Sequence, residues 1–195
     1  MPKHYLIPYV PLKGHKDPDL KELAYGESGV RAKVLKENIG VGSYIFFHTR
    51  IGSSKYITGY LVVAKSMPGK DARKDPSIHC DGRVDELLII GDKTNSKRLR
   101  KPLCFNRHLA ERLSLNHPID FAPLDSGRQT ELQVIGSATR AQRPLTDSDV
   151  ELLLKEIQKH EYNAKVQNPE DVEYYCVFRS KLGHCSGPKW ARVPD

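Results

Sequence analysis

His15, Asp17 and Asp19 place an imidazole and two carboxylates within the short segment His-Lys-Asp-Pro-Asp. A carboxylate in a recess accepts hydrogen bonds from the amino group of a nucleobase, and an imidazole beside a carboxylate can transfer protons. The segment therefore predicts either a pocket in which Asp17 and Asp19 bind a base, or a catalytic group of all three residues. A plain turn, in which the aspartates accept hydrogen bonds from nearby backbone N–H groups, explains the same pattern without a ligand.

Aromatic side chains alternate in the apolar segment at residues 43–49, which predicts a strand. Tyr44, Phe46 and His48 share one face of that strand, because successive side chains point to opposite faces. An open face of this kind stacks a base that has left the double helix. We therefore expect a base pocket formed by Asp17 and Asp19 together with these three residues. In the alternative, Phe46 belongs to the core and His48 ends the hairpin.

Cationic side chains gather between residues 93 and 112, in a chain with 31 Lys and Arg against 24 Asp and Glu and a net charge of +7. A basic surface favours a polyanion, because each neutralised phosphate releases counterions. We expect nucleic acid as the partner, with DNA favoured over RNA. A solvated basic face on a protein-interaction domain is the alternative. The expected phosphate-binding residues are Lys97, Arg98, Arg100, Lys101 and Arg107.

The sequence offers little support for a cofactor. Only Cys104 and His108 have the spacing of half a zinc site, and cysteine is otherwise a good small core residue. No nucleophile elbow, phosphate-binding loop or deaminase zinc motif occurs. We therefore expect no metal and no cofactor, and a binding module rather than an enzyme. The other cysteines are Cys80, Cys176 and Cys185.

Hydrophobic periodicity predicts an α+β fold with a small, curved, mostly antiparallel sheet or barrel flanked by helices. We expect one domain over residues 1–195, in which a C-terminal helix and strand extend the core. No apolar run is long enough to span a membrane, and a cytoplasmic protein is expected. Strands are predicted at residues 4–10, 43–49, 55–65, 84–92 and 172–180, and helices at 28–38 and 146–160, with a basic loop at 93–101; residues 103–115 have helical register, and residues 131–136 fit either a strand or a helix.

The motif H-x-D-P-D-L at His15–Leu20, followed by "IGVGSYIFF", resembles the third nucleotide-modification-associated domain family. More broadly, the helix, turn and hairpin from Val34 to Ser66 resemble PUA-like domains of the PUA, ASCH and EVE group, with Ser43 in place of their usual aspartate. The resemblance covers about residues 14–64. It implies a PUA-like core and a role in recognising a modified or flipped base. It also implies a nuclease or a modification system as a further partner.

Overall fold

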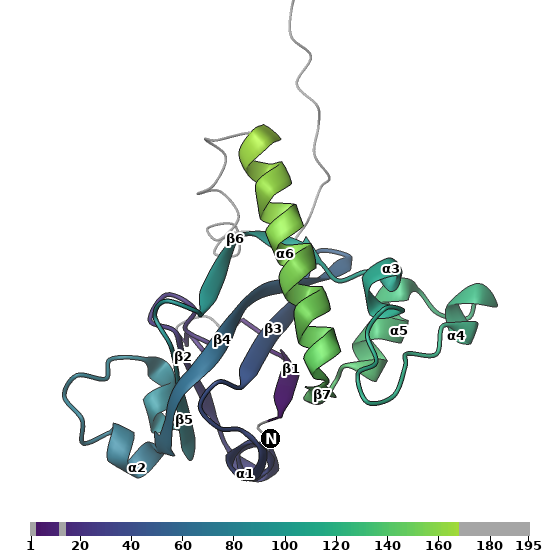
Figure 1. Cartoon of the computed structure of the whole chain (residues 1–195). Coiled ribbons are helices and arrows are strands. Elements are labelled where there is room, and N and C mark those ends of the chain that lie inside the picture. Colours follow the sequence, from purple (N-terminus) through teal and green to yellow (C-terminus); the bar gives the residue numbers. More distant parts are fainter. Residues whose placement is uncertain (1–2, 12–14, 168–195) are drawn as a thin grey trace, which may run out of the picture.

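The computed structural model describes residues 3–11 and 15–167 of the 195-residue chain. It is a mixed α+β structure in which helices surround one sheet, and the longest helix lies across the sheet (Figure 1). The strands are β1 (His4–Pro8), β2 (Ala24–Glu27), β3 (Tyr44–Ile51), β4 (Ser54–Pro68), β5 (Leu87–Gly91), β6 (Lys97–Cys104) and β7 (Arg143–Leu145). The helices are α1 (Gly29–Asn38), α2 (Gly69–Ala72), α3 (Arg107–Ala110), α4 (Ala122–Asp125), α5 (Glu131–Ala138) and α6 (Asp147–Gln167), with a 3-10 turn η1 (Asp81–Val84).

The sheet has the strand order β2-β5-β4-β3-β1-β7, and β6 also pairs with β4. Among the described strands, β1 and β3 run parallel, and the other pairs are antiparallel. Among the described residues, the end strands β2 and β7 do not pair with each other, so the sheet stays open rather than closing into a barrel. The predicted α+β class with a mostly antiparallel sheet flanked by helices is confirmed.

The β3–β4 hairpin forms as predicted, and it organises the molecule. One edge of β4 pairs with β3, while the other edge pairs first with β6 and then with β5. The register shifts between Ile57 and Gly59, and a glycine inside a strand is typical of a bulge or a close backbone approach. Both occur at Gly59: a Cβ atom there would lie 2.6 Å from the carbonyl oxygen of Lys97.

Both faces of β3 are covered. Phe46 packs into one core with Leu153 and Ile157 of α6, whereas Phe47 packs into a second core with Leu35 of α1. Because Phe46 and Phe47 are neighbours on a strand, α6 and α1 lie against opposite faces of the sheet. Residues 45–49 of the strand are therefore buried on both faces, and only its ends at Tyr44, Arg50 and Ile51 reach the surface.

Helix capping explains where the predicted helices begin. Asp149 Oδ2 accepts a hydrogen bond from the N–H of Thr146 at 3.0 Å, and the N–H of Asp149 donates to Thr146 Oγ1 at 3.2 Å, as expected at the start of α6. The ambiguous segment at residues 131–136 is a helix, α5. Thr130 and Gln133 form a full capping box at its start, and this local signal favours the helix.

Three expectations differ from the structure. The basic segment is not a loop but strand β6, because Leu99 and Leu103 alternate into the core between exposed cations. The helical register at residues 103–115 yields only the four-residue α3. Strand β2 was not predicted. The strand predicted at residues 172–180, with Cys176, lies outside the described residues, as does Cys185. None of the described helices is long and apolar enough to cross a membrane.

Candidate functional site

The segment between His15 and Ala24 turns back onto β2. Paired backbone hydrogen bonds of 2.8 and 3.0 Å join Asp19 and Ala24. The Oδ1 atom of Asp19 accepts the N–H groups of Lys21 and Glu22 at 3.0 and 3.1 Å. Asp19 therefore has the turn-capping role that the sequence left open, and its carboxylate is not held out toward a ligand.

Asp17 instead points at the junction between β2 and η1. Its Oδ1 atom accepts the N–H of Gly26 at 2.8 Å. A Cβ atom on Gly26 would lie 2.5 Å from Gly82 Cα and 2.4 Å from Asp85 Oδ2. The two glycines thus let the η1 turn lie directly on β2, and this close packing brings Asp85 to Asp17.

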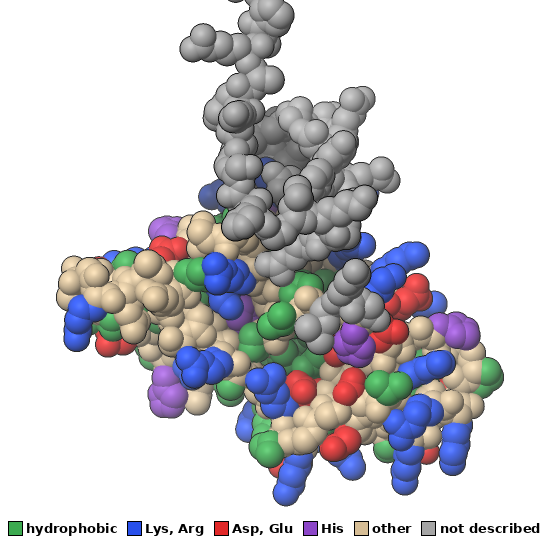
Figure 2. All heavy atoms as spheres, turned by 180° about the vertical axis from the view of Figure 1, so that it is seen from behind, with side chains coloured by type: hydrophobic (Ala, Val, Ile, Leu, Met, Phe, Trp, Pro, Cys, Tyr) green, Lys and Arg blue, Asp and Glu red, His purple; other side chains and the backbone are tan. Residues whose placement is uncertain are grey.

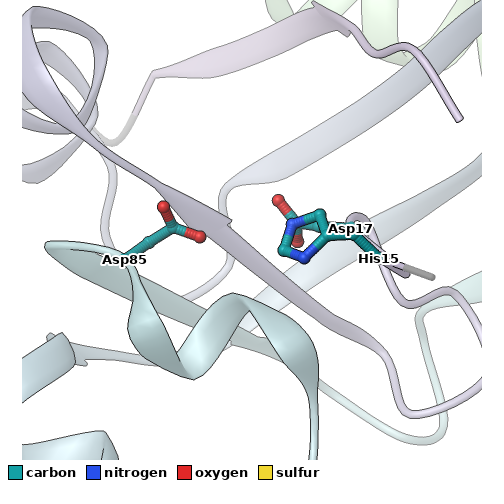
Figure 3. A group of neighbouring side chains, drawn as sticks. All are labelled: His15, Asp17 and Asp85. Carbon is teal, nitrogen blue, oxygen red and sulfur yellow. The ribbon is translucent and has the colours of Figure 1, made fainter. Parts of the chain in front are cut away.

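His15, Asp17 and Asp85 form one compact group. One ligand atom from each lies within 4.8 Å of the others, and all three residues are partly buried (Figure 3). Asp85 Oδ1 also accepts the hydroxyl of Ser28 at 2.6 Å. The sequence did not predict Asp85 as part of this group, because Asp85 lies far from His15 and Asp17 in the chain. The available signal was the "DGRVDE" segment, where a glycine lies between two acidic residues.

The electrostatics of this site are unusual. Burial raises the pKa of Asp17 to about 7, and the nearby carboxylates of Asp85, Glu27 and Asp81 raise it further, while the hydrogen bond from Gly26 opposes them. The carboxyl of Asp17 is therefore present in both protonation states near neutral pH. Such a group both donates and accepts hydrogen bonds.

The aromatic side of the predicted pocket does not form. Phe46 and His48 are 0% exposed, so neither can stack a base, and Tyr44 is partly buried against the core that contains Phe46. Asp17 lies on the other side of the sheet, where Tyr25 and Phe47 pack. The sequence pattern separated the two faces of β3 but did not show that helices cover both.

His48 is a buried core histidine rather than a ligand-binding one. Neither ring nitrogen has a hydrogen-bond partner among the described residues, and the ring meets the edge of Phe105 at 5.7 Å between centroids. Burial lowers its pKa to about 3, and Lys55 contributes in the same direction. His48 is thus neutral in the folded protein at physiological pH.

The predicted phosphate-binding residues divide into two groups. Arg98, Arg100 and Lys101 are exposed on β6. Lys97 is paired with Glu161, and Arg107 is paired with both Glu111 and Asp125. The two carboxylates raise the pKa of Arg107, so its guanidinium stays protonated, and their negative charges offset its own. On the face in Figure 2, Lys and Arg side chains are interspersed with Asp and Glu, so the +7 charge does not form one uniform patch there.

The acidic turn and the basic strand meet at one position of β4. A Cβ atom on Gly59 would lie 2.9 Å from Leu20 Cδ1, 2.6 Å from the Lys97 carbonyl oxygen and 3.3 Å from Arg98 Cα. Leu20 is the last residue of the H-x-D-P-D-L motif. The turn that carries His15 and Asp17 therefore lies beside the start of β6.

Replacing Gly26 by alanine tests the packing that assembles the site. The new methyl group would overlap backbone atoms of Gly82, so we expect a loss of at least about 2 kcal/mol in unfolding free energy, measured by urea denaturation. Gly136→Ala in α5 is the matched control. There the methyl group would make an ordinary 3.6 Å contact with Lys55, and a gain of about 0.5–1 kcal/mol is expected. Equal effects of the two variants would contradict the close packing.

Of the cysteines, the structure describes Cys80 and Cys104, and neither belongs to a group of side chains arranged to hold a metal. Cys80 is buried and Cys104 is partly buried, and both carry free thiols. Cys104 ends β6, while His108 is exposed on α3. Among the described residues, the only group of three or more His, Cys, Asp or Glu side chains arranged to hold a metal is the one at His15, Asp17 and Asp85.

Comparisons with solved structures find distant structural neighbours. No protein-family model matches the chain, and no curated protein matches it. A hypothetical protein from Leishmania major is 15% identical, with a TM-score of 0.47 over 83% of this chain and 98% of that one. Human THYN1, in complex with DNA containing 5-methylcytosine, is 17% identical, with a TM-score of 0.44 over 80% of this chain and 98% of that one.

A third neighbour is the N-terminal domain of McrB from Thermococcus gammatolerans, bound to m5C DNA. It is 11% identical, with a TM-score of 0.34 over 85% of this chain and 99% of that one. Likenesses this distant do not place the chain in a family.

Proposed function

We propose that this protein binds nucleic acid at the surface where the His15–Leu20 turn meets β6, and that Asp17 recognises a single base there. The observation that carries the proposal is that Leu20 and the Lys97–Arg98 backbone both lie against Gly59 of β4, so the turn that carries Asp17 is near the exposed cations of β6. Arg98, Arg100 and Lys101 then bind phosphates, and the turn meets the base. A DNA ligand and a modified base are part of the proposal.

The protonation of Asp17 indicates which bases it recognises. A carboxyl group that is part protonated at neutral pH donates one hydrogen bond and accepts another. Cytosine and adenine present an adjacent amino donor and ring-nitrogen acceptor on the pairing edge, which becomes accessible only when the base leaves the stack. We therefore propose an amino-bearing base, extruded from its partner, as the ligand of Asp17.

Tyr9 takes the stacking role in place of Phe46 and His48. It is partly buried, and its hydroxyl donates to Thr58 Oγ1 at 3.0 Å. Thr58 precedes Gly59, where Leu20 contacts β4. Tyr9 and Leu20 also pack against the same core, so an aromatic ring lies on the same part of the sheet as the turn.

A base-modifying enzyme is the second candidate, and one observation favours it. A carboxyl with a pKa of about 7 and an imidazole within 4.8 Å have the composition of a general acid–base pair. In that case His15 and Asp17 act on the bound base, and Asp19 remains in the turn. Turnover that Asp17→Asn abolishes while binding persists would establish this function.

The double variant Arg98→Ala plus Arg100→Ala tests the phosphate contacts. Both side chains are exposed on the outer face of β6. We expect weaker binding to every duplex sequence and a log–log salt dependence flatter by about 2, since each lost phosphate contact contributes about 0.9 to that slope on B-DNA. Fluorescence anisotropy at several salt concentrations measures both effects.

The control removes the same charge elsewhere, as Arg128→Ala plus Arg140→Ala, which are exposed before and after α5. It should leave the salt slope nearly unchanged. An equal change in both double variants would mean that only net charge matters, and an unchanged slope in the β6 variant would exclude β6 from the interface.

A further inference from the structure

We propose that His15, Asp17 and Asp85 bind a divalent transition-metal ion. The three side chains come from two segments that are far apart in the sequence, the turn before β2 and the end of η1. Figure 3 shows His15 and Asp17 together on one side and Asp85 approaching from the other. The inference goes beyond nucleic-acid binding and does not depend on it, because the ion is bound by side chains of this chain alone. With the ion bound, the Asp17 carboxyl is deprotonated and occupied, so its proposed hydrogen bonds to a base belong to the ion-free protein.

The spacing suits a shared ion. Nitrogen and oxygen ligands of Zn²⁺ lie at about 2.1 Å, so two donors on one ion are at most about 4.2 Å apart. The three donor atoms here lie within 4.8 Å of one another. Side-chain rotations that move the donor atoms by less than about one ångström would therefore bring these atoms to coordination distance.

One hydrogen bond holds each of the two carboxylates in place. The N–H of Gly26 binds Asp17 Oδ1, and the Ser28 hydroxyl binds Asp85 Oδ1. Within the described part of the chain, the other oxygen of each carboxylate accepts no hydrogen bond. Such outer hydrogen bonds orient the ligands of a metal and leave lone pairs for the ion itself.

The carboxylates around the site form no ion pair within the described part of the chain. Glu27 and Asp81 lie near Asp17, and none of the ion pairs between described residues includes any of these carboxylates. Arg73 donates instead to the Val84 carbonyl at 2.8 Å, and Arg83 to the Ile78 carbonyl at 3.0 Å, while Arg31 acts electrostatically on Tyr25 beside Glu27. A bound cation would offset the remaining negative charge.

The donor set selects the kind of ion. Mg²⁺ and Ca²⁺ prefer oxygen ligands alone, whereas one imidazole with two carboxylates suits Mn²⁺, Fe²⁺ or Zn²⁺. Three protein ligands leave coordination positions open, as in sites that bind a further ligand. Because the turn adjoins β6, an ion here also turns a carboxylate cluster that repels phosphate into a neutral or attractive surface.

Binding of Mn²⁺ to the full chain, without nucleic acid, tests the site directly. Mn²⁺ is the probe because it has little preference for thiolate, so the cysteines do not compete. The electron paramagnetic resonance signal of free Mn²⁺ is titrated against wild-type protein and three variants. Asp85→Asn and His15→Ala each remove one ligand. Glu86→Gln removes an exposed carboxylate next to the site that makes no side-chain hydrogen bond among the described residues.

We expect one Mn²⁺ per wild-type chain, the same affinity in Glu86→Gln, and affinity lower by at least about tenfold in Asp85→Asn and His15→Ala. Circular dichroism identifies a variant that has lost its fold. His15→Ala alters only a partly buried side chain in a turn, so it keeps the test decisive if Asp85→Asn unfolds. No binding at millimolar Mn²⁺, or equal affinity in all four proteins, would overturn the proposal and leave nucleic-acid binding untouched.

Discussion

Asp17→Asn is expected to stabilise the protein at about pH 8 by about 3–4 kcal/mol relative to wild type, and to have little effect near pH 4. The folded-state pKa of Asp17 is raised from 3.8 to about 7. The stability from its protonated carboxyl is therefore fully present below pH 3.8 and is lost as the pH rises through about 7. Asparagine remains neutral and still accepts the hydrogen bond from Gly26, so the variant avoids this loss.

Urea unfolding at several pH values, with EDTA present to exclude metal ions, measures the difference. Glu86→Gln removes an exposed carboxylate from the adjoining segment, and should follow the wild type at every pH. A pH-independent difference between Asp17→Asn and wild type would show that Asp17 has an ordinary pKa. In that case the native carboxyl would not destabilise the fold near neutral pH, and its destabilising effect would no longer indicate a functional role.

In the wild type, the buried His48 should lower the free energy of unfolding by about 4 kcal/mol as the pH falls from 6.5 to about 3, and His48→Phe is expected to lack this decrease. The folded-state pKa of His48 is lowered from 6.5 to about 3. In this interval the unfolded chain binds a proton that the folded chain does not, so wild-type stability falls as the pH falls. Phenylalanine fills a similar volume beside Phe105 and does not titrate.

The measurement is the difference in unfolding free energy between His48→Phe and wild type at each pH, which cancels the titration of other groups. The control His79→Gln changes an exposed histidine and should leave the pH dependence as it is. If the unfolding free energies of His48→Phe and wild type depend on pH in the same way, His48 is accessible to protons in the folded state. Ligand binding by His48 would then again be a valid hypothesis.

The parts of the fold with strong local signals were predictable. The β3–β4 hairpin follows from two aromatic and β-branched segments around a short glycine turn, and α6 follows from its apolar period and its Thr146–Asp149 cap. Strand β6 was hidden because exposed cations dominate its composition, although Leu99 and Leu103 reach the core. Local pattern identifies an element, but the sequence does not show which neighbours cover it.

The site was predictable only in part. The H-x-D-P-D-L motif identified Asp17 and His15, and its resemblance to a base-modification family favoured a functional role over a plain turn. Asp85 joins them only because Gly26 and Gly82 allow a backbone contact that no single-sequence rule predicts. Phe46 and His48 were assigned to the pocket because a two-residue period predicts a face, whereas its exposure depends on tertiary packing.

Recognition of an extruded base by Asp17 is tested most directly by comparing a fully paired DNA duplex with one that carries a single central mismatched cytosine, in EDTA and at two salt concentrations. A mismatch lowers the free energy of extrusion by up to a few kcal/mol. We predict that wild-type protein binds the mismatched duplex at least about tenfold more tightly, and that Asp17→Ala, which can neither donate to nor accept from the base, keeps the affinity for the paired duplex but loses this preference. Equal affinity of the wild type for both duplexes, or an undiminished preference in Asp17→Ala, would contradict the account.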